Sequence, residues 1–222
     1  MLAAASPIAH AQRQDADTLV EAVVMVDDQA SFFSQARRYC ANQVPARKAG
    51  INRAAVFWAS NNGPEIYAVE AWKAAPGREK EVAQMREQKN AAVNALLQQV
   101  KAIKAEDACA HFEKSWTDRS ADIAKSTPRA SAFLREYYSS LRLPAKALEL
   151  IDEGVGCLTR SVNAGRDYDA SVRSCDCSTN IMFTELSDTE RAEVRRRAHD
   201  NGSVGDYAPY TRIKPRLAEC FR

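Results

Sequence analysis

Two cysteines separated by a single residue, Cys175 and Cys177, are the closest pair of thiols in the sequence. Thiolates at this spacing can bind a soft metal ion, with His199 as a further ligand, or can carry out thiol–disulfide exchange. A closed zinc site needs about four ligands and commonly uses CxxC spacing, and a thioredoxin-type enzyme places CxxC beside a βαβ pattern. The CxC spacing in a helical chain therefore favours structural disulfides over metal or redox chemistry.

Four more cysteines bring the total to six, an even number. An even count outside the reducing cytosol is typical of a disulfide framework, although six cysteines allow about fifteen different pairings. We expect Cys157 and Cys220 each to bond with one member of the Cys175/Cys177 pair, and the sequence does not choose between the two members. The remaining pair is Cys40 with Cys109.

The N-terminal residues indicate export from the cytosol. Residues 6–12 resemble the end of a secretory signal, with small Ala9 and Ala11 placed for cleavage before Gln12. The apolar stretch before them is short, so we interpret residues 1–11 as the remnant of a signal peptide; an ordinary Ala-rich N-terminus is the alternative. The interpretation predicts a periplasmic or secreted protein, which agrees with oxidised cysteines.

Composition and charge exclude several classes of partner. Of the 222 residues, 45% are hydrophobic and 27% are charged, as in ordinary globular proteins. Lys and Arg total 31 against 29 for Asp and Glu, so the net charge is only +2 and offers no general attraction for nucleic acid. Two basic clusters, at residues 37–53 and 191–197, are interleaved with apolar and acidic residues as on a solvated helix face. No apolar run approaches the roughly 20 residues of a membrane span.

The hydrophobic pattern predicts an all-α protein, a helical bundle with a smaller disulfide-stapled helical C-terminal part. Apolar residues recur at three- and four-residue steps nearly everywhere, and no alternating strand pattern stands out. The strongest helix, 78–104, would span about 40 Å and form the spine of the bundle. Further helices are expected near 18–40, 46–60, 65–75, 145–158, 171–186 and 188–199, after Asp107 and from Pro128, with an irregular segment from residue 201 to Cys220.

A boundary between two domains is expected at residues 141–144, where Pro144 follows a short polar and aliphatic stretch. The prediction is a helical N-terminal domain, 12–143, and a helical cysteine-rich C-terminal domain, 144–222. The cysteines divide into two and four across this boundary, so each domain can be closed by its own disulfides.

The sequence assigns no catalytic residue, no metal site and no cofactor. A G-x-S-x-G elbow, an H-E-x-x-H pair and a Gly-rich phosphate loop are all absent from the sequence. We expect His111 to be a partly buried core residue and His199 to be solvated at a helix end. Two sets of acidic residues could in principle perform acid–base chemistry, but the spacing within each set is that of solvent-facing charges on a helix. They are Glu149, Asp152 and Glu153, and Asp118 and Asp122.

The aromatic residues suggest how the protein could act. Most should lie in the core, but any left exposed around the turn at 61–64 or in the C-terminal tail would suit a protein partner. The candidates are Trp58, Tyr67, Trp72, Tyr207 and Tyr210. The sequence thus predicts an exported, non-catalytic helical protein that binds another macromolecule, such as a periplasmic inhibitor or immunity-type protein. The alternative is a thiol–disulfide or metal-binding protein that uses Cys175 and Cys177.

Overall fold

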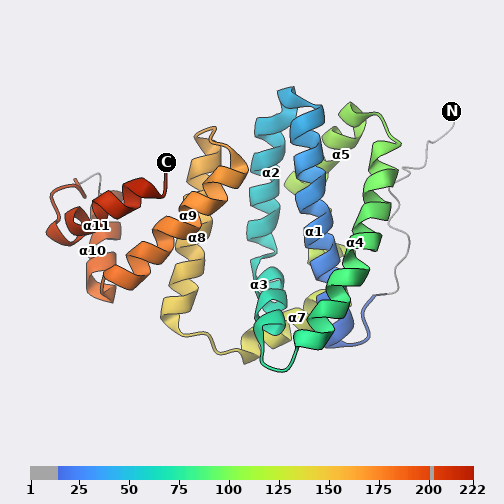
Figure 1. Ribbon diagram of the computed structural model, residues 1–222, viewed down its shortest axis with the longest axis horizontal. Coiled ribbons are helices and arrows are strands. Elements are labelled where there is room, and N and C mark those ends of the chain that lie inside the picture. The colour runs from blue at the N-terminus through green and yellow to red at the C-terminus, as the bar shows by residue number, and fades with distance from the viewer. Residues whose placement is uncertain (1–14, 201–202) are drawn as a thin grey trace. The chain divides into compact units, whose positions relative to one another are not determined.

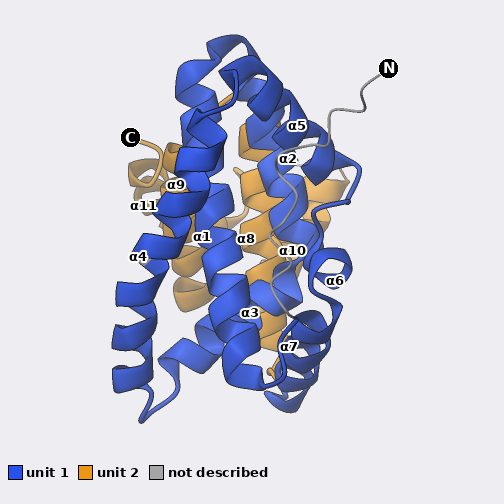
Figure 2. Cartoon of the chain, turned by 90° about the vertical axis from the view of Figure 1, so that its right-hand side faces the viewer, with its two compact units in different colours: residues 1–142 blue, residues 143–222 orange. Residues whose placement is uncertain are grey.

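The computed structural model describes residues 15–200 and 203–222, apart from the side chain of Asn90. Residues 1–11, interpreted above as a signal remnant, lie outside this range. Every regular element of the described residues is a helix, as the sequence pattern predicts (Figure 1). The chain divides into two compact units, of which the first ends at Arg142 and the second begins at Leu143 (Figure 2). None of the helices in the described residues is long and apolar enough to cross a lipid bilayer.

The described residues of the first unit, from Asp15 on, form seven α-helices and one short 3-10 helix. Their bounds are α1 (Leu19–Gln43), η1 (Pro45–Arg47), α2 (Lys48–Asn61), α3 (Gly63–Ala74), α4 (Glu79–Lys101), α5 (Ala105–Thr117), α6 (Ile123–Ser126) and α7 (Pro128–Ser140).

The central helix of the first unit is α1. It begins with a capping box in which the Thr18 hydroxyl accepts the Glu21 N–H and the Glu21 carboxylate accepts the Thr18 N–H. Its side chains are buried around much of its circumference, and it contacts α2, α3, α4, α5 and α7. The expected spine at 78–104 is therefore wrong: α4 lies against α1 at one side of the bundle (Figure 1). The physical reason is that its buried residues, such as Met85, Val93 and Val100, form one narrow stripe on an otherwise polar helix.

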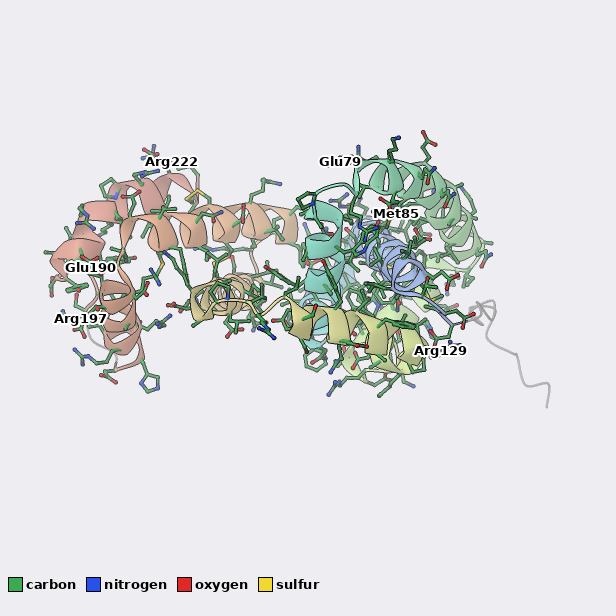
Figure 3. All side chains as sticks on the ribbon, turned by 90° about the horizontal axis from the view of Figure 1, so that it is seen from below. Glu79, Met85, Arg129, Glu190, Arg197 and Arg222 are labelled. Carbon is green, nitrogen blue, oxygen red and sulfur yellow. A yellow bond between two sulfur atoms is a disulfide. The ribbon has the colours of Figure 1, made fainter. Side chains whose placement is uncertain are left out.

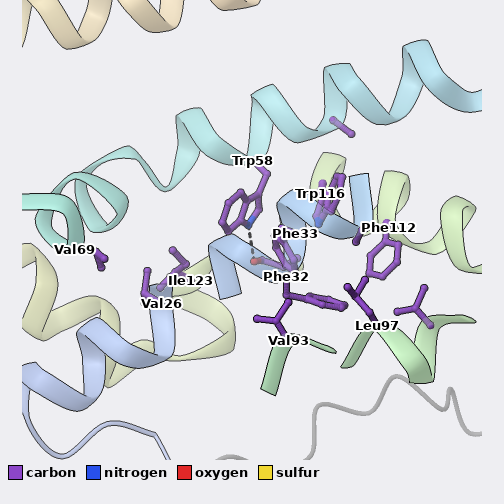
Figure 4. Packing of buried hydrophobic residues seen from close by; sticks show 14 of the residues in the cluster. Val26, Phe32, Phe33, Trp58, Val69, Val93, Leu97, Phe112, Trp116 and Ile123 are labelled. Atoms are coloured by element: carbon purple, nitrogen blue, oxygen red, sulfur yellow. Dashed lines mark hydrogen bonds between the residues drawn. The ribbon is translucent and has the colours of Figure 1, made fainter. Parts of the chain in front are cut away.

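An aromatic cluster fills the centre of the first core (Figure 4). The ring of Phe33 lies 4.5 Å from that of Trp58 and 5.3 Å from that of Trp116, centroid to centroid. Phe112 stacks on Trp116 at 5.6 Å. Trp58 donates its indole N–H to the carbonyl of Ala121 at 2.9 Å, which satisfies a polar group that burial would otherwise leave unpaired.

Two carboxylates fix α7 to distant parts of the first unit. Asp15 accepts the backbone N–H groups of Arg129 at 2.7 Å and Ala130 at 3.1 Å, and so caps the start of α7. Glu65, at the start of α3, is fully buried. Its Oε1 accepts the Ser131 hydroxyl at 2.7 Å and pairs with the Arg135 guanidinium at 2.5 Å, both on α7.

Two local boundaries differ from those expected. The segment 61–64 is not an extended turn, because Asn62 alone separates α2 from α3 and Pro64 occupies the first turn of α3, where its missing N–H is tolerated. Asn62 is buried; its amide donates to the Trp58 carbonyl and accepts the Ile123 N–H. The helix expected after Asp107 begins two residues earlier, so Asp107 lies in its first turn, where an acidic residue favours the helix dipole.

The second unit is an antiparallel pair of long helices with two shorter helices at one end. The bounds are α8 (Ala145–Asn163), α9 (Tyr168–Glu185), α10 (Asp188–His199) and α11 (Ala208–Glu219). The helix expected at 188–199 begins with a capping box, in which Ser187 and Glu190 exchange side-chain and backbone hydrogen bonds. A small second core joins α9, α10 and α11, and its buried members are Ile181, Leu186, Val194, Ile213 and Leu217.

The expectation of an irregular segment up to Cys220 is wrong, because α11 occupies most of it. Pro209 lies in the first turn, where a helix tolerates proline, whereas Pro215 lies inside the helix. Packing outweighs the missing hydrogen bond at Pro215: Ile213 is fully buried and Leu217 is 8% exposed in the second core. Tertiary contacts rather than local propensity therefore determine this helix.

Candidate interaction surface and cysteine framework

The six cysteines form three disulfides, one in the first unit and two in the second. Cys40 of α1 bonds with Cys109 of α5 across a Cα–Cα distance of 5.5 Å, as expected from the sequence. Cys157 of α8 bonds with Cys175, and Cys177 bonds with Cys220, each with a Cα–Cα distance of 5.7 Å. Each member of the CxC pair thus takes a different partner, which is the arrangement that the sequence predicted without assigning the partners.

Helix geometry explains why Cys175 and Cys177 do not act as one site. Residues two apart on an α-helix point about 200° apart around its axis. Cys175 therefore faces α8 and is 2% exposed, whereas Cys177 is exposed on the other side of α9. His199, the further ligand of the metal hypothesis, is exposed at the end of α10 beside Asp200. Within the described residues, no cluster of His, Cys, Asp and Glu side chains could hold a metal ion.

Two of the five aromatic candidates lie in the first core. Trp58 is 5% and Trp72 is 1% exposed, so neither can anchor a partner at the surface. The reason is that both indoles belong to the first core, where burial of a large ring stabilises the bundle more than exposure would.

The other three aromatic candidates are half-buried. Tyr67 packs edge-on against Tyr138 with their ring centroids 5.7 Å apart. Tyr207 and Tyr210 pack against the second core, and the Arg197 guanidinium lies 4.9 Å from the centroid of the Tyr207 ring. These tyrosines contribute an edge to the surface rather than a projecting anchor.

The exposed apolar side chains of the second unit are mainly aliphatic. On α8, Leu148 is 40% and Val155 is 38% exposed, and on the neighbouring helix α9, Val172 is 41% exposed. Leu148 and Val155 are two helical turns apart and so share one face of α8. We call Leu148 and Val155 the aliphatic surface. Helical spacing places Leu148, Ile151, Val155 and Leu158 on one face of α8, where Ile151 and Leu158 are half-buried and Leu148 and Val155 are exposed.

The contacts of α8 leave this aliphatic surface outside the second core. The side of α8 that meets α9 carries Cys157 and Ser161, whose hydroxyl lies 2.9 Å from that of Ser171. Small residues at this contact let the two helices approach closely. The second core lies at the far end of α9 with α10 and α11, and its buried members include no residue of α8.

An ion-pair network fixes the polar side of α8. Glu149 accepts hydrogen bonds from Arg191, at 3.2 and 3.3 Å, and pairs with Arg195, which also reaches Glu153 at 3.5 Å. Arg191 is 1% exposed and lies 4.2 Å from the ring centroid of Phe183. The hydrogen bond from Arg191 lowers the pKa of Glu149, and Arg195 adds to this effect against the opposing effect of burial. Glu149 is therefore the anion of a structural network that binds α10 to α8.

The remaining candidates for chemistry are placed separately. Asp118 ends α5, where the Ser120 hydroxyl and N–H lower its pKa. Asp122 precedes α6, is only 4% exposed and pairs with Arg119 at 2.7 Å, so the expectation of a solvent-facing carboxylate is wrong for this residue. His111 is exposed, contrary to the expected core position, because it lies on the outer side of α5 from buried Cys109 and Phe112.

A shallow hollow lies along the surface of α5. Its lining residues are Arg47, Ala110, Glu113, Lys114, Thr117 and Asp118. Arg47 binds Glu106 at 2.6 Å and Glu113 at 3.1 Å, so the strongest charges at this hollow neutralise each other. Such a site presents little unpaired charge to a small ligand.

Comparisons with known proteins add no assignment to this geometry: no family model, curated protein or solved structure matches the chain.

Proposed function

We propose that the chain is an exported, non-catalytic, disulfide-stabilised helical protein that acts by binding another protein, in the manner of a periplasmic inhibitor or immunity-type protein. The observation that carries the proposal is the aliphatic surface of Leu148 and Val155 on α8, which a disulfide links covalently to α9. Side chains of this kind are favourable to bury in a contact and are held in place before binding, so little ordering entropy is lost on association.

The partner that fits this surface is a protein with an apolar groove or helix face. Because the aliphatic residues follow helical spacing on α8, they can insert between the side chains of a partner helix in the way that helix pairs pack. The charged residues Glu149 and Glu153 lie on another side of α8 and are already paired with arginines. Binding through the aliphatic surface therefore requires no separation of these ion pairs.

The test compares capture of partners by matched variants. The double variant L148Q/V155Q replaces the aliphatic surface by polar residues that favour helix formation, and V20Q is its control, because Val20 is 42% exposed on α1. The proposal expects a specific partner from an envelope extract that is captured by wild type and V20Q and lost with L148Q/V155Q. Equal capture by all three proteins would contradict it.

Export has an independent test. Expression with the native N-terminus and intact-mass analysis of the mature protein should give a chain that begins at Gln12 and is 6 mass units lighter than its fully reduced form, from three disulfides. A chain that retains residues 1–11 and carries six thiols in the cell would overturn the proposed location.

A further inference from the structure

The three disulfides differ in how far they are accessible from solvent. Both Cys40 and Cys109 are fully buried, and Cys175 is 2% exposed beside half-buried Cys157. Cys177 is exposed and its partner Cys220 is half-buried. Because thiol–disulfide exchange begins with direct attack of a thiolate on a sulfur atom, access decides which disulfide reacts first. The Cys177–Cys220 disulfide is the accessible one.

This disulfide joins α9 to the residue that follows α11, across a sequence separation of 43 residues (Figure 3, near the labelled Arg222). The enclosed segment contains α10 and α11. α10 is bound to α8 by the ion pairs of Arg191 and Arg195 with Glu149, so the disulfide directly restrains α11, which we call the C-terminal arm. On α11 only Ile213 and Leu217 are buried. A segment held by so few buried side chains opens at low free energy once a covalent constraint is removed.

The polar contacts of α11 are at the surface. Arg212 donates to the carbonyl of Glu185 at 2.8 Å, and Arg216 forms an ion pair with the Glu185 carboxylate. Both arginine side chains are about 60% exposed, so these contacts are solvated and contribute little to holding the arm. The disulfide is therefore the principal constraint on α11 besides the packing of Ile213, Leu217 and half-buried Tyr210.

We infer that the Cys177–Cys220 disulfide is a site of reversible thiol–disulfide exchange with a protein dithiol, and that its reduction releases the C-terminal arm. This inference goes beyond the proposed binding function and does not depend on it. A thiolate of the dithiol attacks the Cys177 sulfur, the Cys177–Cys220 bond breaks, and the Cys220 thiolate leaves and takes up a proton. The second thiolate of the dithiol then attacks the mixed disulfide, which restores Cys177 as a thiol and leaves the dithiol oxidised. Two electrons pass from the dithiol to the cysteine pair.

Release of the arm uncovers part of the second core. Ile181 and Leu186 share the second core with Ile213 and Leu217 of α11, and they become more accessible when α11 moves away. The Cys157–Cys175 disulfide still clamps α8 to α9, so the aliphatic surface stays in place. Reduction thus changes the apolar surface of one end of the second unit without unfolding the helix pair.

The first experiment uses the full chain and a titration with dithiothreitol, followed by alkylation and peptide mapping. The inference expects Cys177 and Cys220 to be alkylated at least about tenfold faster than Cys157 and Cys175, with Cys40 and Cys109 unreacted while the fold persists. Simultaneous reaction of all six cysteines, or earlier reaction of another pair, would overturn it.

The second experiment measures backbone hydrogen exchange in the selectively reduced protein and in the variant C177S/C220S. Both should show at least about tenfold faster exchange in α11 than the oxidised wild type, with α8 and the facing part of α9 unchanged. The control C157S/C175S should instead raise exchange at the α8–α9 contact. If α11 stays as protected from exchange after reduction as before, the disulfide does not hold the arm and the inference is wrong. The exchange measurement on reduced wild-type protein remains a valid test even where a variant fails to fold.

Discussion

Removal of the Cys40–Cys109 disulfide should be the most damaging covalent change in the first unit. The bond joins α1 to α5 across a sequence separation of 69 residues. In the chain-entropy model, a closed loop of this length lowers the entropy of the unfolded chain by about 15 cal/mol/K, which stabilises the folded state by about 4 kcal/mol at 25 °C. Since a domain is stable by only about 5–15 kcal/mol, the variant C40A/C109A should lose a large part of its stability.

The three tryptophans provide a probe of this unit. Trp58, Trp72 and Trp116 all lie in the first core, and the sequence contains no other tryptophan. Their fluorescence during guanidinium chloride unfolding therefore reports the first unit. With a slope of about 4 kcal/mol/M, a loss of about 4 kcal/mol lowers the midpoint by about 1 M.

The control is wild-type protein unfolded in the presence of a reductant. The reductant breaks the Cys40–Cys109 disulfide in the unfolded chain, so the unfolding midpoint of wild-type protein with reductant should approach that of C40A/C109A. A variant whose midpoint lies within about 0.3 M of oxidised wild type, with an unchanged slope, would refute the reasoning that this loop closure stabilises the unit.

Three further predictions concern buried or capping charges. Burial alone would raise the pKa of Asp15, but the hydrogen bonds from three backbone N–H groups together outweigh it and lower this pKa. The stabilisation that the Asp15 carboxylate gives to the folded state is therefore complete above the ordinary carboxyl pKa and is lost as the pH falls through the lowered pKa. D15A should cost about 1 kcal/mol at pH 7 and little at pH 2 in denaturant titrations. E65A should destabilise the first unit by about 3 kcal/mol, because it leaves the Ser131 hydroxyl without its acceptor, whereas E65Q should cost less; tryptophan fluorescence separates the two, and equal losses would contradict this account. R191A should destabilise the second unit by about 3 kcal/mol, since Glu149 loses its buried partner, and hydrogen exchange in α10 should rise while α9 stays protected.

Local sequence chemistry was sufficient to predict most of the secondary structure. The capping pairs Thr18/Glu21 and Ser187/Glu190 start their helices independently of the tertiary structure, because both hydrogen bonds of each pair form within four residues. The even cysteine count likewise predicted a cross-linked framework. In contrast, α11 was missed because Pro215 argues against a helix and only packing of Ile213 in the second core overrides it.

The sequence by itself determined an all-α, disulfide-stabilised chain, since helical periodicity and cysteine number are local or additive properties. Only the tertiary structure decided that Cys175 bonds with Cys157 and Cys177 with Cys220, because the choice depends on which side of α9 faces α8. Tertiary packing also decided which apolar residues are exposed: Trp58 and Trp72 are buried in the first core, whereas Leu148 and Val155 remain at the surface. Helical spacing shows that residues share a face, but burial of that face depends on whether another element covers it.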